Sequence, residues 1–245
     1  MYMTNLNQTS FQAIINQINS VLLPIGMMEA HGPHATLATD LLIPREFAKR
    51  IDAALGERLL VAPEIPYGHS WGLAPFPGTI DVAGEVFANY VFEVGKGLYL
   101  NGLENIILFN GHGGNIPSLS LVSEKLADLG LTVLTINWWL DYREAIIQIA
   151  PETGHAGEDE TSVIMAIDPA LVELGDVSHH VIDFPRNLKL RDGGKAMYPN
   201  AFSGNAGAAT VAKGEAIIAA LLPLMIADIE TMWKYAVEAQ SGGGK

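Results

Sequence analysis

Three short segments of this chain combine histidine with carboxylate side chains at spacings that suit a metal ion. The first segment runs from Glu29 to Asp40 and contains His31. Residues that alternate along an extended backbone point to the same side, so Glu29 and His31 can face one centre, and the turn at Gly32 can return Asp40 to it. Such a mixed ligand set suits Zn²⁺, Mn²⁺ or Fe²⁺. The alternative is a polar loop in which Thr39 or Asp40 only caps the next helix.

The second segment, residues 110–115, reads Asn-Gly-His-Gly-Gly-Asn and has His112 near its centre. Its glycines permit a positive φ and close backbone approach, so we expect His112 on a tight turn before a helix that starts near Pro117. Two other interpretations stay open: Asn115 caps that helix, or the turn binds a phosphate. The segment lacks the G-x-G-x-x-G pattern and a P-loop lysine, which disfavours a nucleotide site.

The third segment places His155 shortly before three consecutive acids, Glu158, Asp159 and Glu160. Acids at a helix start interact favourably with the helix dipole, which accounts for Glu158 and Asp159. That account does not explain His155, and it leaves Glu160 free to point inward. Together the three segments supply the histidine and carboxylate ligands that a dinuclear metal site requires.

The composition restricts the remaining function classes. With 27 acidic and 14 basic residues and a net charge of -13, the chain is unsuited to nucleic acid or an anionic membrane. It has no cysteine, so any metal must be held by His, Asp or Glu. The longest apolar run, residues 216–227, is shorter than the ~20 residues of a membrane span and contains Pro223. Since the first basic residue is Arg45, no signal peptide is recognisable, and we expect a soluble cytoplasmic protein.

Short apolar runs alternate with helix-length segments along the chain. The runs that predict buried strands are Val21–Ile25, Leu59–Ile65, Ile106–Phe109 and Leu131–Ile136. The predicted helices are Pro44–Leu55, Val86–Leu100, Pro117–Leu129, one starting near Glu160 and one that carries Met225, Ile229 and Met232. This alternation predicts an α/β fold with a mostly parallel sheet covered on both faces, and functional loops at the carboxyl ends of its strands. We predict one domain over residues 1–240 and a flexible tail over 241–245.

Four motifs, in this order, resemble those of the creatininase family of metal-dependent amidohydrolases. They are Pro24-Ile-Gly26 with Glu29-x-His31-Gly-Pro-His34 and Thr39-Asp40, then Phe76-Pro-Gly-Thr79-Ile80, Asn110-Gly-His112-Gly-Gly-Asn115, and His155-Ala-Gly157-x-x-Glu160-Thr-Ser162. The resemblance runs from about Leu23 to Gly214. It implies a three-layer α/β/α sandwich, a two-metal centre, a small-molecule substrate and a homo-oligomer, often a homohexamer.

By position, the resemblance implies Glu29, Asp40 and His112 around one ion. His31, the bridging Asp40 and a further Glu would hold the second. In creatinine-hydrolysing members that Glu follows the histidine of the second segment by two residues, but Gly114 stands there in this chain. We therefore assign Glu160 to the second ion. The departure argues against creatinine itself as the substrate. Zn²⁺ is the first expectation for both ions, with Mn²⁺ or Fe²⁺ as alternatives.

The substrate pocket is expected to differ from that of other members. Many of them carry a histidine where this chain has Leu73, so His69 and Trp71 are candidate replacements. Trp138 and Trp139 form either an aromatic wall for a flat substrate or an apolar cap over the sheet or at a subunit interface. The remaining histidines are assigned by their positions: His34 to the pocket or to the outer surroundings of the metals, and His179 and His180 to the solvated surface.

The resulting functional prediction is hydrolysis of an amide-type C–N bond in a cyclic amide or a formamide. Two divalent ions supply hydroxide at neutral pH, and His155, with its near-neutral pKa, moves the proton to the leaving nitrogen. The same chemistry would serve a lactone or a keto-sugar. A non-catalytic metal- or ligand-binding protein is the remaining alternative. Whether Glu158 or Asp159 orients His155 stays open.

Overall fold

A four-stranded parallel sheet forms the centre of the computed structural model, which describes residues 1–175, 177, 179–185 and 188–242. The strands are β1 (Ser20–Ile25), β2 (Leu60–Val61), β3 (Asn105–Asn110) and β4 (Thr132–Asn137), in the spatial order β2-β1-β3-β4. All three pairings are parallel, which confirms the predicted α/β class. The strand predicted over residues 59–65 is shorter than expected, because Pro63 and Pro66 lack the amide hydrogen that a strand ladder needs.

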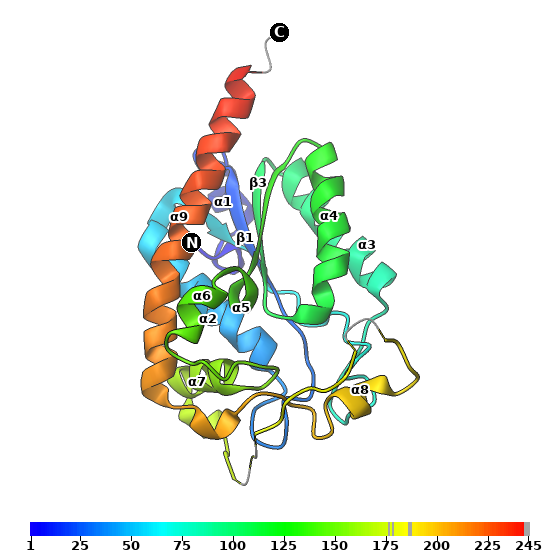
Figure 1. Ribbon diagram of the computed structural model, residues 1–245. Helices are drawn as coiled ribbons and strands as arrows, with labels where there is room; N and C mark the ends of the chain where they lie inside the picture. The colour runs from blue at the N-terminus through cyan, green and yellow to red at the C-terminus, as the bar shows by residue number, and fades with distance from the viewer. Residues whose placement is uncertain (176, 178, 186–187, 243–245) are drawn as a thin grey trace.

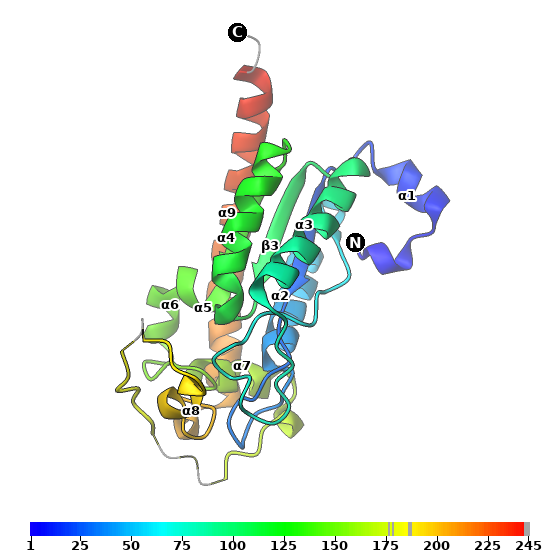
Figure 2. The ribbon, with the colours of Figure 1, turned by 90° about the vertical axis from the view of Figure 1, so that its right-hand side faces the viewer.

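Helices cover both faces of this sheet, as the predicted three-layer sandwich requires. They are α1 (Gln8–Ile14), α2 (Thr39–Leu55), α3 (Gly84–Leu100), α4 (Ile116–Asp128), α5 (Trp138–Asp141), α6 (Arg143–Ile147), α7 (Glu158–Ile167), α8 (Gly193–Met197) and α9 (Val211–Gly242). Figures 1 and 2 show α3 and α4 on one side of the sheet and α2 and α9 on the other.

Alternation along the strands divides the core between these two layers. In β1, Leu22 packs with residues of α2 and α9, whereas Val21 and Leu23 pack with residues of α3 and α4. All three side chains are fully buried. Because both faces are covered, the strands are apolar at nearly every position, which is why they were recognisable as continuous apolar runs.

The functional segments lie where the direction of the connections changes. The chain leaves β1 through α2 toward β2, and it leaves β3 through α4 toward β4 at the opposite edge. Adjacent strands with diverging connections open a crevice at their carboxyl ends. The first two histidine segments follow β1 and β3 directly. The third does not follow a strand but lies between α6 and α7, and these loops gather with α7 and α8 at the end opposite the C-terminus (Figure 2).

The last helix, α9, extends past the sheet (Figure 1) and continues through Pro223, which does not end it. It reaches Gly242, two residues into the predicted tail, and residues 243–245 lie outside the described part of the chain. Its stretch Val211–Ala239 is long and apolar enough for a membrane span: an 18-residue window within it has a mean hydropathy of 1.7, and 33% of that window is buried. Because Ile217, Leu221 and Met225 pack in the core, and core helices pass the same test, this finding assigns no membrane span.

Candidate metal centre

Asp40 lies in the first turn of α2, which begins at Thr39 rather than at the predicted Pro44. Residue Ala38 precedes the helix and no side chain caps it, so the capping interpretation of Thr39 and Asp40 is wrong. Pro44 has no N–H to offer the Asp40 carbonyl, and the loops after β1 and β3 approach that oxygen closely. A Cβ on Gly26 or Gly111 would lie 2.5 or 2.2 Å from it, so both positions require glycine.

The Asp40 carboxylate lies between two histidines. Its Oδ1 is 3.1 Å from His31 Nε2, and its Oδ2 is 2.9 Å from His112 Nδ1. Glu29 Oε1 is 3.3 Å from the same nitrogen of His112, and Glu160 Oε2 is 3.8 Å from His31 Nε2. All five side chains are buried. The structure therefore brings the predicted ligands together in two triads that share Asp40, and within each triad the ligand atoms lie within 4.8 Å of one another.

Backbone carbonyls orient the histidines of the centre. The Glu29 carbonyl accepts a hydrogen bond from His31 Nδ1 at 3.1 Å. In the same way, the His69 carbonyl accepts from His112 Nε2 at 3.0 Å, and the Ala30 carbonyl accepts from His155 Nε2 at 2.9 Å. A carbonyl oxygen can only accept, so the donating nitrogen of each ring must carry a hydrogen. The other nitrogen of each ring then faces the carboxylates, which is the arrangement that metal-binding histidines show.

Glu29 tests whether the centre fits a metal ion. The residue is 0% exposed, and neither of its carboxylate oxygens makes a hydrogen bond among the described residues. A buried carboxylate without donors is costly, and a divalent cation would supply the missing positive charge. The mixed imidazole and carboxylate donors suit Zn²⁺ or Mn²⁺. The residues of the two triads therefore fit divalent metal ions.

Crowded carboxylates change the pKa values of these groups. Burial opposes protonation of His31, but the carboxylates of Asp40, Glu160 and Glu29 outweigh it and raise its pKa to about 9. The pKa of His112 is raised well above its usual value for the same reason, with Glu29 as the largest contributor after burial. Burial and the charge of Asp40 raise the pKa of Glu160 as well. The metal-free centre thus holds protons where metal ions would place positive charge.

Metal uptake is therefore expected to release protons. His31 is protonated below about pH 9 in the metal-free protein, and a metal binds only the neutral imidazole. The apparent Zn²⁺ affinity should keep rising between about pH 6.5, the pKa of an ordinary histidine, and about pH 9, where His31 loses its proton. Calorimetric titration in buffers of different ionisation enthalpy counts the released protons. His155→Ala should leave that count unchanged, and uptake near neutral pH without proton release would contradict a ligand role for His31.

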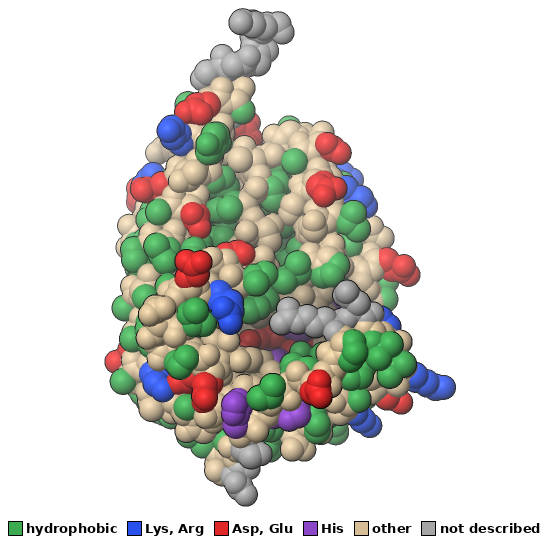
Figure 3. All heavy atoms as spheres, viewed as in Figure 1, with side chains coloured by type: hydrophobic (Ala, Val, Ile, Leu, Met, Phe, Trp, Pro, Cys, Tyr) green, Lys and Arg blue, Asp and Glu red, His purple; other side chains and the backbone are tan. Residues whose placement is uncertain are grey.

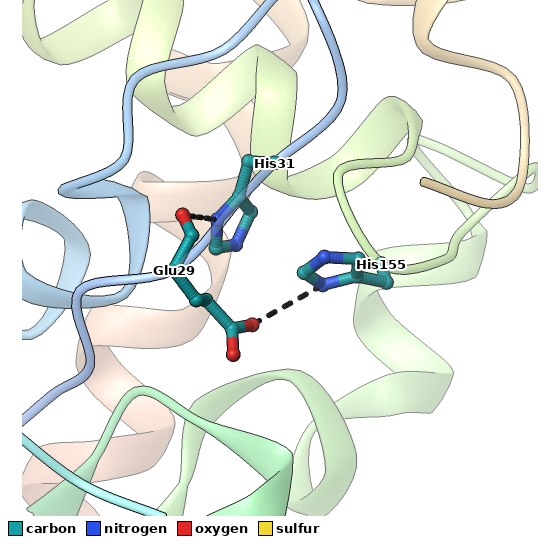
Figure 4. A group of neighbouring side chains, drawn as sticks. All are labelled: Glu29, His31 and His155. Carbon is teal, nitrogen blue, oxygen red and sulfur yellow. Dashed lines mark hydrogen bonds and ion pairs between the residues drawn. The ribbon is translucent and has the colours of Figure 1, made fainter. Parts of the chain in front are cut away.

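His155 belongs to a third triad, with Glu29 and His31 (Figure 4). Its Nδ1 lies 3.6 Å from Glu29 Oε1 and, because Nε2 donates to Ala30, presents a lone pair. Burial, with the neighbouring charge of His31, lowers its pKa to about 4, below the near-neutral value that the sequence suggested. In the metal-free protein His155 is therefore a neutral proton acceptor at physiological pH.

The acids at the start of α7 hold the loop that carries His155. Each accepts a hydrogen bond from an alternate amide of that loop: Glu158 Oε2 from Glu152 at 2.9 Å, Asp159 Oδ1 from Gly154 at 3.2 Å, and Glu160 Oε2 from Ala156 at 2.6 Å. Glu158 also pairs with Lys213 of α9. An interaction with the helix dipole is therefore only part of their role, since Glu158 and Asp159 fix the loop beside the centre.

A cavity of about 1150 Å³ opens over the centre, and Figure 3 shows the hollow with acidic and histidine side chains in and around it. Three predicted pocket residues, His69, Trp71 and Trp139, line this cavity. Trp138 does not. It is 0% exposed and packs in the core against Phe47, because the chain turns into α5 directly after β4. The prediction of Trp138 as a pocket wall is wrong.

His34 was also predicted to contact the pocket, and it lies outside it. Its side chain is buried behind the His155 loop, where Nε2 is 3.0 Å from the carbonyl oxygen of Ala156 and 3.3 Å from Thr161 Oγ1. It is not among the residues that line the cavity. His34 therefore supports the loop that carries His155, as an outer residue of the centre.

A comparison with known families decides between the interpretations of this geometry. The family model described as creatininase, creatinine amidohydrolase, matches residues 4–229. The chain belongs to the creatininase family. It is therefore a hydrolase of that family, as its motifs suggested.

Curated creatininase-family relatives act on different substrates. Creatinine amidohydrolase of Pseudomonas putida is 29% identical over 180 residues, 65% of this chain and 68% of that protein. The mycofactocin precursor peptide peptidase of Mycolicibacterium smegmatis is 29% identical over 229 residues, covering 89% and 87%. The 3-dehydro-scyllo-inosose hydrolase of Thermotoga maritima is 28% identical over 179 residues, covering 69% and 57%. The peptidases widen the range beyond the non-peptide amides that the sequence suggested.

Solved creatininase structures share the fold. A mutant creatininase of the zinc–zinc type is 26% identical, with a TM-score of 0.81 over 94% of this chain and 97% of that one. A creatininase with manganese is 25% identical, with a TM-score of 0.80 over 94% and 97%. Zinc and manganese thus occur in relatives with the same architecture.

Gly114, at the position where the family resemblance implies a ligand Glu in creatinine-hydrolysing members, has no room for a side chain. A Cβ there would lie 2.0 Å from the carbonyl oxygen of His69 and 2.5 Å from His112 Nε2. Asn115 holds this contact in place, since its Oδ1 accepts the His69 amide at 2.9 Å. It therefore does not cap α4 with its side chain, contrary to one interpretation of the sequence. The backbone around Gly114 in this creatininase-family member therefore leaves no space for a glutamate at that position.

Two histidines of the cavity wall were not predicted to line a pocket. Both His179 and His180 line the cavity; His179 is solvent-exposed, as predicted, whereas His180 is partly buried. They are placed there by a backbone pairing in which His180 and Gly204 exchange hydrogen bonds of 3.0 and 2.8 Å. No local pattern announces a pairing between residues so distant in sequence. No sequence motif marks His179 and His180 as wall residues, and only the tertiary structure reveals this position.

Proposed function

We propose that this creatininase-family hydrolase cleaves an amide-type C–N bond, with two divalent metal ions held by Glu29, His31, Asp40, His112 and Glu160. The observation that carries the proposal is the pair of buried triads sharing Asp40, with the free nitrogen of His155 beside them. The amidohydrolase and peptidase relatives, whose names describe C–N cleavage, support this reaction class.

The side chains divide the chemistry between them. The two triads would hold divalent ions, which would supply hydroxide at neutral pH and an electrophile for the substrate carbonyl. His155 Nδ1 accepts the proton of the nucleophile and passes it to the leaving nitrogen. Glu29 Oε1, 3.6 Å from that nitrogen, stabilises the protonated form of His155. The Ala30 carbonyl keeps Nε2 protonated, so Nδ1 is the atom that exchanges the proton.

The substrate we propose is an amide other than creatinine. The closed backbone at Gly114 departs from the pattern of creatinine-hydrolysing members, and the buried Leu73 stands where many family members carry a histidine. A cavity of about 1150 Å³ with Trp71 and Trp139 on its walls holds more than a single small ring. Cyclic amides, formamides and short peptides are the amide classes to test.

A keto-sugar is the second candidate, because the Thermotoga maritima relative is a 3-dehydro-scyllo-inosose hydrolase. The same triads would serve it, since the activated nucleophile attacks a carbonyl in either case. The walls of the cavity, rather than its metal ligands, would distinguish the two substrate classes.

A substrate panel tests the proposal. Zn²⁺- or Mn²⁺-loaded protein is expected to turn over at least one compound among cyclic amides, formamides and short peptides, and Asp40→Asn should abolish that turnover, because Asp40 belongs to both triads. Product formation is followed by mass spectrometry. Turnover confined to lactones or keto-sugars would replace the amide assignment. A loaded protein inactive on the entire panel would count against the amide class as a whole.

A further inference from the structure

One residue holds both backbone polar groups of His155. Ser203 Oγ accepts the His155 N–H at 3.0 Å, and the Ser203 N–H donates to the His155 carbonyl at 2.7 Å. Ser203 is 5% exposed and lines the cavity. A contact at two points fixes both the position and the orientation of the His155 backbone, and hence the point from which its imidazole side chain extends.

The segment that contains Ser203 connects the metal loop with the cavity wall. On one side the Ala201 carbonyl accepts the amide of Gly32 at 2.8 Å. On the other side Gly204 pairs with His180 through two backbone hydrogen bonds. Residues 201–204 thus tie His155 to the wall on which His180 lies.

Backbone strain on both sides shows that this arrangement is imposed. Ala156, next to His155, has a φ of 50°, and Ala201 has a φ of 57°. Non-glycine residues in the left-handed region are strained and persist only where their surroundings hold them. The fit is also close, since a Cβ on Gly154 would lie 2.6 Å from the Ser203 carbonyl oxygen. The Ser203 contacts are among those that can hold the strained loop.

We propose that Ser203 is a positioning residue that sets His155 Nδ1 against the metal centre. The inference rests on the proposed role of His155 in proton transfer. Without the hydroxyl, the His155 amide loses its acceptor and the loop gains freedom, while the metal ligands keep their own contacts. Proton transfer is sensitive to such a change, because a displacement of ~1 Å at a reacting group can cost about 10²-fold in rate.

Ser203→Ala tests the proposal against a matched control, Ser118→Ala. Ser118 is 7% exposed, and its Oγ donates a hydrogen bond to the Gly84 carbonyl at 3.0 Å. Both variants are loaded with Zn²⁺ as full chains. Ser203→Ala should keep the wild-type Zn²⁺ content and exchange the amides of residues 152–157 about tenfold faster. On a compound that the panel identifies, its kcat should fall about 10- to 100-fold with KM nearly unchanged. Ser118→Ala should show neither change.

The exchange measurement needs no substrate, so it stands even if the amide panel fails. Exchange at wild-type rates in Ser203→Ala, or an equal effect on the His155 loop in Ser118→Ala, would overturn the proposal. Ser203→Cys guards against a variant that does not fold, because sulfur keeps the volume of the side chain while accepting hydrogen bonds poorly. It should exchange faster than wild type, and a wild-type rate in a folded Ser203→Cys would also overturn the proposal.

Discussion

His155→Ala is expected to lower kcat by ~10²- to 10⁴-fold while the chain keeps its metal ions. Nδ1 of His155 carries a lone pair beside Glu29, whereas Nε2 is committed to the Ala30 carbonyl. Removal of the ring thus removes the proton carrier and leaves the two triads that share Asp40 intact. Metal content by mass spectrometry and turnover of a panel compound measure the two effects separately.

The control for this variant is His31→Ala. His31 faces Asp40 and Glu160 with Nε2, so its removal should lower metal content and activity together. Loss of metal from His155→Ala would be informative in itself, because His155 also lies within ligand distance of Glu29 and His31. If His155→Ala loses metal as His31→Ala does, His155 is a ligand and the proton carrier must be sought elsewhere.

The metal centre was predictable because its residues follow rules that act over short stretches of chain. Parallel strands bring their carboxyl ends to one edge, so the segments after β1 and β3 had to meet. Alternation placed Glu29 and His31 on one side of the loop. The two glycines that pack on the Asp40 carbonyl lie in the quoted motifs, although only the structure shows why glycine is required at these positions.

The cavity wall was less predictable because tertiary packing decides it. Trp138 and Trp139 are adjacent and chemically alike, yet the immediate start of α5 after β4 turns one into the core and the other toward the cavity. His34 lies in the same motif as Glu29 but contacts the far side of the His155 loop. His180 reaches the wall through its pairing with Gly204, which leaves no local signal.

Glu160→Gln is expected to reduce bound metal from about two ions per chain to about one. The wild-type Glu160 Oε2 accepts the Ala156 amide, and a glutamine oxygen can accept the same bond, so the His155 loop should stay in place. What is lost is the negative charge facing His31, and with it a charged ligand of the second triad. Equilibrium dialysis against Zn²⁺, followed by elemental analysis, gives the stoichiometry.

Substitutions of two neighbouring carboxylates, Asp159 and Asp40, serve as comparisons for Glu160→Gln. Asp159→Asn alters the adjacent residue, which is 3% exposed, lines the same cavity and accepts the Gly154 amide, so it should retain about two ions. Asp40→Asn should retain almost none, because both triads depend on it. The order of retention, with Asp159→Asn above Glu160→Gln and Glu160→Gln above Asp40→Asn, reflects the sharing of Asp40. Two ions retained in Glu160→Gln would remove Glu160 from the ligand set, and the second ion would then need another carboxylate at a centre where Gly114 leaves no room for one.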